Sequence, residues 1–430
     1  MLERLFALET FGIKLGLENI GRLCDALGHP ERTFLSLHIA GTNGKGSVTA
    51  MAHAALVAAG IRAARYTSPH LVHLHERFVV GNAPVDDETL RQVADDVLDC
   101  ADDLQRNGLL PSPPTFFEAT TAMAFEIFRR KRVDVAVIEV GLGGRFDATN
   151  VLVPPVGAIT SIAFDHEQHL GHTLAEIASE KAGIIKPAMV VVCGSLPPIA
   201  LDVMKRAAAE RGASLVEAVR DSRVDYGMEE GRARLTVETA KDRYGPMLLA
   251  LRGEHQVGNA VVAARVLEAA GAHGVNVPAS AVVQGFATVN WPARLEIFQL
   301  SEGRRVLLDA AHNPEGARAL RTYLAAWQPE RPVLVIGLMR DKDADAIVGE
   351  LLPVTSAVIA TSAATTRAMP AKELAARVRV LDAERPVDVY ADVGAALDAA
   401  LAKSSTVCVA GSIFLAGEVR ESLEQRGILR

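Results

Sequence analysis

Short apolar runs and amphipathic stretches alternate along the first part of the chain. Residues 34–40 (FLSLHIA) and 133–140 (VDVAVIEV) predict buried strands, and residues 45–59 predict an Ala-rich helix that ends at Gly60. The same patterns predict two more strands and two more helices, at residues 156–162 and 189–193 and at residues 117–130 and 174–184. Such alternation is typical of a mostly parallel sheet that is covered by helices on both faces.

The rhythm changes between residues 220 and 250, where residues 232–239 and 246–251 predict short antiparallel strands. A second α/β series begins near Arg305, with strands predicted at residues 306–309, 333–337, 357–360 and 407–410. Pro292 interrupts the chain between the two series, so we place the domain boundary there. We therefore predict an α/β protein of two domains, residues 1–293 and 294–430, each a mostly parallel sheet flanked by helices.

Composition narrows the class of protein. The chain of 430 residues is too long for a domain with one ordinary hydrophobic core. Of its residues 49% are hydrophobic, which is enough for two cores. The net charge is −7 without a run of Lys or Arg, so we expect no nucleic-acid partner. Four widely spaced cysteines indicate a reducing compartment, and residues 1–20 hold neither a signal peptide nor a membrane span. We expect a cytoplasmic protein with no membrane partner.

The sharpest signal is a glycine-rich loop, residues 41–47 (GTNGKGS), between a predicted strand and a predicted helix. Glycines let successive N–H groups point at phosphate oxygens, and the helix N-terminus adds positive partial charge. Lys45 can reach the terminal phosphates, and Ser47 can ligate Mg²⁺. The loop departs from the standard P-loop pattern, because Ile39 replaces the first Gly and Gly46 replaces the usual Ser or Thr. The competing interpretation is a turn without a ligand. The candidate nucleotide contacts are Asn43, Gly44, Lys45, Gly46 and Ser47.

Three further residues are candidates for metal or catalytic chemistry. Glu139 ends a predicted strand, at the edge where open parallel sheets bind ligands, and it suits Mg²⁺. His166 follows the next strand, although Mg²⁺ prefers oxygen ligands. Lys181 lies near the end of a predicted helix among small and apolar residues, where a desolvated amine can react with CO₂ to give a carbamate. Each has a plain structural alternative: a hydrogen-bonded Glu, a polar-network His and a solvated Lys.

A series of motifs is more specific than any one of them. After the loop come residues 66–71 (YTSPHL), 115–118 (TFFE), 139–150 (EVGLGGRFDATN), 165–166 (DH), 180–186 (EKAGIIK), 291–296 (WPARLE), 309–314 (DAAHNP) and 411–412 (GS). Their order resembles the folylpolyglutamate synthase and dihydrofolate synthase family, a branch of the Mur ligase superfamily, over nearly the whole chain.

The resemblance implies an ATP-dependent ligase that moves the γ-phosphate of ATP to a substrate carboxylate and then adds L-glutamate to the acyl phosphate. The acceptor would be a folate, dihydropteroate or both, and the enzyme would be a monomer that uses two Mg²⁺ ions. The first domain would bind ATP and the pterin, and the second would close over ATP and bind glutamate.

The resemblance also implies roles for individual residues. Lys45, Lys181 and His312 would be catalytic, with Lys181 carbamylated. The metal ligands would be Ser47, Ser68, Glu139 and His166. Further ATP contacts would come from Asn259, Arg294 and Asp309. Substrates would contact Thr115, Phe117 and Arg145 on the pterin side, and His312, Arg367 and Ser412 on the glutamate side, where a cap or turn role is the alternative for each.

Two clues disagree about the acceptor. Family members that use dihydropteroate often carry Asp before Leu-Gly-Leu, where this chain has Lys14, whereas residues 143–150 look like the bifunctional members. Other functions also stay open. A cell-wall ligase of the Mur type is disfavoured because the first predicted strand already starts at Phe34, which leaves no nucleotide-sugar domain before it. A P-loop ATPase without ligation would have no use for residues 309–314. A pure binding module would leave the glycine-rich loop, the strand-end Glu139 and a cleft between two domains without a shared purpose.

Overall fold

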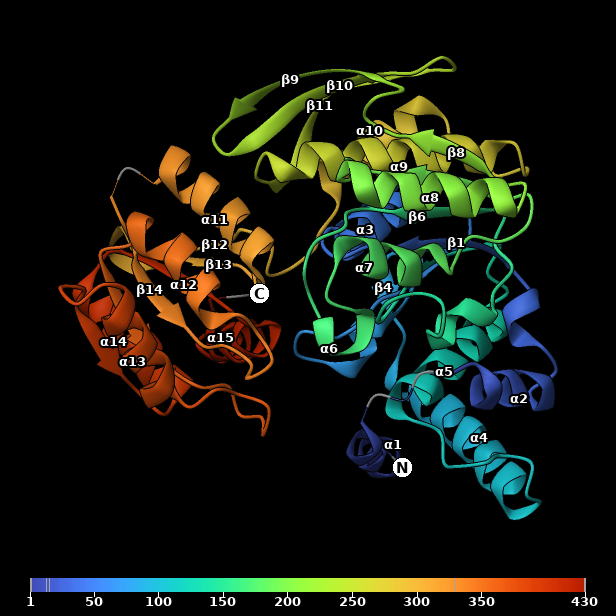
Figure 1. Cartoon of the computed structure of the whole chain (residues 1–430), viewed down its shortest axis with the longest axis horizontal. Helices are drawn as coiled ribbons and strands as arrows, with labels where there is room; N and C mark the ends of the chain where they lie inside the picture. The colour runs from blue at the N-terminus through green and yellow to red at the C-terminus, as the bar shows by residue number, and fades with distance from the viewer. Residues whose placement is uncertain (1, 13, 15, 329, 429–430) are drawn as a thin grey trace. The chain divides into compact units, whose positions relative to one another are not determined.

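The computed structural model describes residues 2–12, 14, 16–328 and 330–428 (Figure 1). The chain divides into two compact units, each made of three segments. Unit 1 comprises Met1–Asp225, Leu235–Leu248 and Gly258–Val289. Unit 2 comprises Tyr226–Arg234, Leu249–Val257 and Asn290–Arg430.

An eight-stranded sheet forms the centre of unit 1. In spatial order its strands are β4 (Ala83–Pro84), β3 (Phe78–Val80), β2 (Ala63–Tyr66), β5 (Val135–Glu139), β1 (Leu35–Ala40), β6 (Val156–Ile159), β7 (Val190–Cys193) and β8 (Ser214–Glu217). From β2 to β8 every pair is parallel, and β3 and β4 add an antiparallel edge. The predicted parallel sheet is confirmed.

Helices cover both faces of this sheet, which is why β5 is buried along its whole length. On one face α5 (Phe116–Arg130) packs over Tyr66 and Ile138. On the other, α3 (Lys45–Ala58) packs against β1, β2 and β5 and against α10 (Ala279–Thr288). Gly285 of α10 permits this contact, because a Cβ there would lie 2.5 Å from the backbone N of Ala55.

The other helices of unit 1 are mostly short. They are α1 (Leu2–Ala7), α2 (Glu18–Ala26), α4 (Asp87–Arg106), α6 (Glu167–Leu170), α7 (Leu174–Ala182) and α8 (Pro198–Glu210), with 3₁₀ turns η1 (Leu8–Phe11), η2 (Pro30–Arg32), η3 (Leu74–Arg77) and η4 (Ala148–Val151). α9 (His255–Gly271) begins in unit 2 and continues in unit 1.

A three-stranded sheet has the order β11-β10-β9, with β9 at Arg223–Glu229, β10 at Arg232–Glu238 and β11 at Arg243–Arg252. Its residues are shared between the two units. The strands predicted at residues 232–239 and 246–251 are confirmed. β9 was not predicted, although Val224, Tyr226 and Met228 recur at every second position. All of its side chains are exposed or half-buried, so no continuous apolar run marks the strand.

Unit 2 contains a six-stranded sheet. Its order is β12 (Glu296–Gln299), β13 (Arg305–Leu308), β17 (Thr406–Ala410), β14 (Val333–Ile336), β15 (Ala357–Ala360) and β16 (Val387–Val389). Only β12 runs antiparallel to its neighbour. The helices are α11 (Pro314–Trp327), α12 (Ala344–Leu351), α13 (Ala371–Leu381), α14 (Val393–Lys403) and α15 (Ile413–Gln425), with 3₁₀ turns η5 (Ser301–Gly303) and η6 (Leu352–Val354).

All four strands that the sequence predicts in this region are present, as β13, β14, β15 and β17. Their side chains are almost entirely buried and build a second core with α11, α12 and α13. Within the part of the chain that the structure describes, no helix is both long and apolar enough to span a bilayer.

Candidate active site

The candidate residues of unit 1 gather at one edge of the sheet. The glycine-rich loop follows β1, which lies between β5 and β6. Glu139 ends β5, and Thr160 follows β6. Because these strands are parallel, their carboxyl ends share one edge, which is where such sheets bind ligands. This neighbourhood depends on the strand order, which the sequence does not reveal.

Two glycines in the loop have no room for a side chain. Gly41 has φ +145°, and a Cβ there would lie 2.0 Å from Thr160 Oγ1. Gly44 has φ +84°, in the left-handed region, and a Cβ there would lie 2.3 Å from Asn259 Oδ1. The loop can therefore approach its neighbours closely only because both residues are glycine. The predicted nucleotide contact Asn259 lies directly against it.

The loop is held by the segment that follows β6. The backbone N–H groups of Thr42 and Asn43 donate to the carbonyl and the hydroxyl oxygen of Ser161, each at 2.9 Å. The Thr160 hydroxyl donates to the Asn43 carbonyl at 2.6 Å. Sequence reasoning missed Thr160 and Ser161, because they look like an ordinary strand end until β6 is known to lie beside β1.

Two lysine side chains meet at one carbonyl group. Lys45 Nζ donates to Gly41 O at 3.1 Å and to Thr42 O at 3.0 Å. Lys181 Nζ, from α7, donates to Gly41 O at 2.9 Å. Burial, and then the charge of Lys45, lowers the pKa of Lys181 to about 7. Much of this amine is therefore uncharged at neutral pH, the form that reacts with electrophiles.

Three of the four predicted metal ligands, Ser47, Ser68 and Glu139, are close to the loop or to the strand end beside it. Glu139 is 5% exposed and accepts a hydrogen bond from the Ser68 N–H at 3.2 Å. Ser47 is buried in the first turn of α3. His166 has φ 51° and is the N-cap residue that precedes α6, with its Nε2 3.9 Å from Asp165 Oδ1.

The four ligands do not make a site of carboxylates and imidazoles alone. Among the described residues no three His, Cys, Asp or Glu side chains are grouped closely enough to hold a metal ion. Two of the predicted ligands are serines, so such a site would need oxygen atoms from another source, such as the phosphates of a nucleotide.

The predicted pterin contacts lie around the loop after β5. The Phe117 ring stacks on Tyr66 with centroids 6.1 Å apart, and it meets Gly141, where a Cβ would lie 2.5 Å from the ring. Arg145 ties the loop to α7 through Glu180 Oε1 at 3.2 Å. Thr115 caps α5 in a reciprocal capping box with Glu118.

Lys14, where this chain departs from the family pattern, precedes the other predicted pterin contacts along the chain. Lys14 Nζ donates to Ser112 Oγ at 2.6 Å. Leu15, the next residue of the predicted pterin border, lies outside the described residues.

In unit 2, three of the predicted residues follow the ends of the neighbouring strands β13 and β17. Asp309 and His312 come after β13, and Ser412 comes after β17. Asp309 is 7% exposed and accepts from the N–H groups of Leu295 and Ala311, each at 2.9 Å. Burial raises the pKa of Asp309, and the charge of Arg294 opposes that rise. His312 Nδ1 lies 2.8 Å from Ala310 O.

Two glutamate-side candidates have structural contacts of their own. The Ser412 hydroxyl caps α15 by accepting from the Phe414 N–H at 3.1 Å, the alternative that the sequence left open. Ser412 is nevertheless near the loop after β13, because the Gly411 N–H donates to Ala311 O at 2.9 Å. Arg367 is more than half exposed, and its guanidinium lies 3.5 Å from Asp341.

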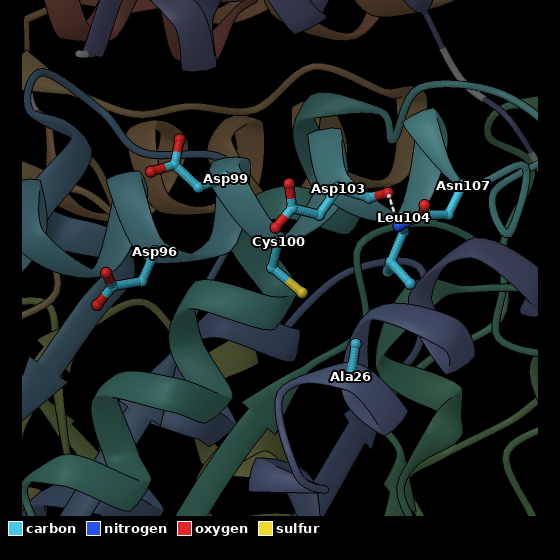
Figure 2. Close-up of a pocket in the computed structure, with 7 residues that line it drawn as sticks. All are labelled: Ala26, Asp96, Asp99, Cys100, Asp103, Leu104 and Asn107. Atoms are coloured by element: carbon cyan, nitrogen blue, oxygen red, sulfur yellow. Dashed lines mark hydrogen bonds between the residues drawn. The ribbon is translucent and has the colours of Figure 1, made fainter.

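A surface hollow of about 430 Å³ lies between α2 and α4 and is lined by Ala26, Asp96, Asp99, Cys100, Asp103, Leu104 and Asn107 (Figure 2). It contains none of the predicted site residues. Its carboxylates are ion-paired with Arg130, Arg4 and Arg106. The hollow is therefore not our candidate site.

Comparison with known proteins identifies the class to which the chain belongs. Residues 103–267 match the Mur ligase middle domain, and residues 293–413 match the Mur ligase glutamate ligase domain. The class is thus that of the Mur ligases. The chain is 35% identical to the folylpolyglutamate synthase of Lacticaseibacillus casei over 93% of this chain and 92% of that protein. It is 33% identical to the dihydrofolate synthase/folylpolyglutamate synthase of Bacillus subtilis over 96% of both.

A solved structure extends this likeness to three dimensions. The folylpolyglutamate synthase of Mycobacterium tuberculosis complexed with ADP has a TM-score of 0.91 and 35% identity, over 98% of this chain and 97% of that one. The chain belongs to the folylpolyglutamate synthase and dihydrofolate synthase family and is an ATP-dependent ligase that forms amide bonds.

Proposed function

We propose that this protein adds L-glutamate to a reduced folate, to dihydropteroate or to both, through an acyl phosphate made with ATP. The observation that carries the proposal is the convergence of Lys45 and Lys181 on the Gly41 carbonyl, at the strand edge that also presents Glu139. The family membership supports the same reaction.

The glycine-rich loop is the proposed phosphate site. Asn43, Gly44, Lys45, Gly46 and Ser47 open α3, whose N-terminal N–H groups favour an anion. The ammonium of Lys45 rests on two loop carbonyls and can turn toward a terminal phosphate. We assign Asn259, Arg294 and Asp309 to nucleotide binding as well. The ADP in the Mycobacterium relative supports a nucleotide at this kind of site.

Two Mg²⁺ ions fit the chemistry of the donors. Ser47, Ser68 and Glu139 offer oxygen atoms, which Mg²⁺ prefers, and His166 offers a nitrogen. When bound, the ions would neutralise phosphate charge and polarise the transferred group. In the structure, the Ser68 N–H already orients the Glu139 carboxylate.

We propose that Lys181 is carbamylated. Its uncharged amine would attack the carbon of CO₂, forming an N–C bond and releasing a proton. A buried cation beside Lys45 would become an anion, so like-charge repulsion would turn into attraction. The amine is buried and its pKa is lowered to about 7, and both conditions favour this reaction.

The ligation itself needs positioning more than a covalent nucleophile. An oxygen of the acceptor carboxylate attacks the γ-phosphorus, and ADP leaves. The glutamate amine then attacks the carbonyl carbon of the acyl phosphate, loses a proton, and phosphate leaves. Phe117 offers a ring for stacking on the pterin, beside Thr115 and Arg145. We assign His312, Arg367 and Ser412 to the glutamate side, where a cation suits carboxylates.

We further propose that one chain acts alone, in the cytoplasm where ATP and glutamate are supplied. The test is product formation from ATP and glutamate, with dihydropteroate and tetrahydrofolate as parallel acceptors and products identified by mass. Glutamate addition to both acceptors establishes a bifunctional enzyme, and addition to tetrahydrofolate alone makes Lys14 a specificity marker. Addition to neither acceptor, with ADP still bound, refutes the proposed substrates.

A further inference from the structure

The turn that carries Arg294 has an unusual backbone. Its two neighbours, Ala293 and Leu295, have φ angles of 55° and 51°, although neither is glycine. Both are almost completely buried, at 0% and 1% exposed. Residues with a Cβ adopt the left-handed region at a cost, so the surrounding structure must hold this turn in place.

Two carboxylates hold it, one on each side of Arg294. The Ala293 N–H donates to Glu296 Oε2 at 2.9 Å, and the Leu295 N–H donates to Asp309 Oδ2 at 2.9 Å. The Ala293 carbonyl is also engaged, by the Ala310 N–H and by Arg294 Nη1, each at 2.9 Å. The two carboxylates therefore fix the backbone on both sides of Arg294, and the start of its side chain is fixed with it.

Glu296 is itself held from two directions. It is the first residue of β12, where it pairs with Leu308, the residue before Asp309. Its Oε2 lies 3.6 Å from Arg420 Nε of α15, and both side chains are at most 20% exposed. Arg420 also forms an ion pair with Glu424 one turn further along α15. Arg420 thus helps to hold the Glu296 carboxylate toward the turn.

We propose that Glu296, supported by Arg420, is a positioning residue for nucleotide binding: it holds the left-handed turn so that the Arg294 guanidinium is presented to ATP. The inference rests on the proposed function in one respect, the assignment of Arg294 to the nucleotide. Glu296 touches no reacting atom and acts only through Arg294. Its contribution must therefore disappear when Arg294 is absent.

A double-mutant cycle on the full chain tests this, with ADP affinity measured by calorimetry. We expect Glu296→Ala to weaken ADP binding about tenfold, because the Ala293 N–H loses its acceptor. Glu296→Gln keeps an acceptor oxygen and stays within about threefold of the wild type. Arg294→Ala weakens binding, and adding Glu296→Ala to it weakens binding no further. The control is Glu302→Ala in the same unit, which removes an exposed carboxylate paired with Arg304 and leaves the affinity unchanged.

Three results overturn the proposal: wild-type ADP affinity in Glu296→Ala, wild-type affinity in Arg294→Ala, or additive losses in the double variant. If Glu296→Ala does not fold, Arg420→Met replaces it in the cycle. It is expected to weaken ADP binding about threefold in the wild type and not at all beside Arg294→Ala. ADP binding is read without any acceptor. Failure of glutamate addition in the wild type would thus refute the proposed substrates and leave this test intact.

Discussion

The two units place their candidate residues at the carboxyl ends of parallel strands by different means. In unit 1 the backbone itself is the binding surface, and glycines without room for a Cβ let Lys45 and Lys181 converge on one carbonyl group. In unit 2 carboxylates hold a turn of non-glycine residues in a left-handed conformation. Unit 1 should therefore be intolerant of added atoms, and unit 2 of lost hydrogen-bond acceptors.

The largest effect is expected from the loop lysine. Lys45→Ala removes the cation that faces the proposed terminal phosphates, and we expect turnover to fall by roughly a thousandfold or more. The exposed Lys205, which is paired with Glu217, supplies a control in the same unit, and Lys205→Ala should keep wild-type turnover. Turnover is read as phosphate released in the presence of glutamate and acceptor. An active Lys45→Ala variant would remove the phosphate-loop assignment.

A matched pair of glycines tests the steric half of the comparison. Gly44 precedes α3 and Gly60 follows it, and their φ angles are similar, at +84° and +77°. A Cβ at Gly44 would meet Asn259, whereas a Cβ at Gly60 would meet no other residue within 4 Å. Gly44→Ala should weaken ADP binding by about a hundredfold or more, since a Cβ must displace Asn259 as well as adopt a strained φ. Gly60→Ala should lower only the melting temperature. Equal ADP affinities in the two variants would contradict the steric account.

Replacing the second lysine should have a smaller, chemically repairable effect. Lys181→Ala removes the site of the proposed carbamate, and we expect turnover to fall roughly a hundredfold. If the carbamate is the active form, added formate should restore part of the turnover by supplying a carboxylate in the space left. The wild type should also lose activity when CO₂ is removed from the buffer. Full activity in CO₂-free buffer, with unmodified Lys181 in a crystal structure, would eliminate the carbamate.

In unit 2 the informative substitution is Asp309→Asn, which removes the charge of the carboxylate and keeps one acceptor oxygen. Asp309 accepts two backbone N–H groups, and Asn can accept only with its single carbonyl oxygen. We expect Asp309→Asn to cost about 1–2 kcal/mol of unfolding free energy and to weaken ADP binding about tenfold. Asp388→Asn, at an exposed pair with Lys403, is the control and should change neither quantity. If Asp309→Asn kept the wild-type unfolding free energy and ADP affinity, the contrast between the two units would not hold.

The effect that is smallest at neutral pH concerns acid stability in unit 1. Burial lowers the pKa of His53 from its ordinary 6.5 to about 3. The unfolded chain therefore binds a proton there that the folded protein does not, so stability is lost as the pH falls from 6.5 toward 3. Replacing His53 with Gln should reduce the slope of unfolding free energy against pH by up to about 1.4 kcal/mol per pH unit in that window. The measurement is denaturant unfolding at several pH values, and an unchanged slope would contradict it.

The sequence predicted the buried strands that form clear apolar runs, but it did not predict β2, which is buried and has the sequence AARY. The runs that became β1, β5, β14 and β17 are apolar because helices cover both of their faces, so their signal survives without any knowledge of neighbours. The exposed strand β9 had no such signal and was missed.

The site was less predictable because it depends on which strands are neighbours. The motifs identified Lys45 and Glu139, but the contact of Thr160 with the glycine-rich loop follows from the pairing of β1 with β6. Residues 291–296 contain no glycine, so nothing in the sequence announces the left-handed turn at Ala293 and Leu295. Lys181 looks like a solvated lysine until the fold places it inside.

The central claim is that the site of unit 1 makes an acyl phosphate from ATP and the acceptor acid. It can be tested by labelling both oxygens of the acceptor carboxylate with oxygen-18 and analysing the phosphate released during glutamate addition. The carboxylate oxygen that attacks the γ-phosphorus stays bound to that phosphorus when the glutamate amine displaces phosphate from the acyl carbon. We therefore expect one labelled oxygen in each phosphate and one in each amide product. Unlabelled phosphate, with both labels retained by the acceptor, would show that ATP is hydrolysed by water and would contradict the account.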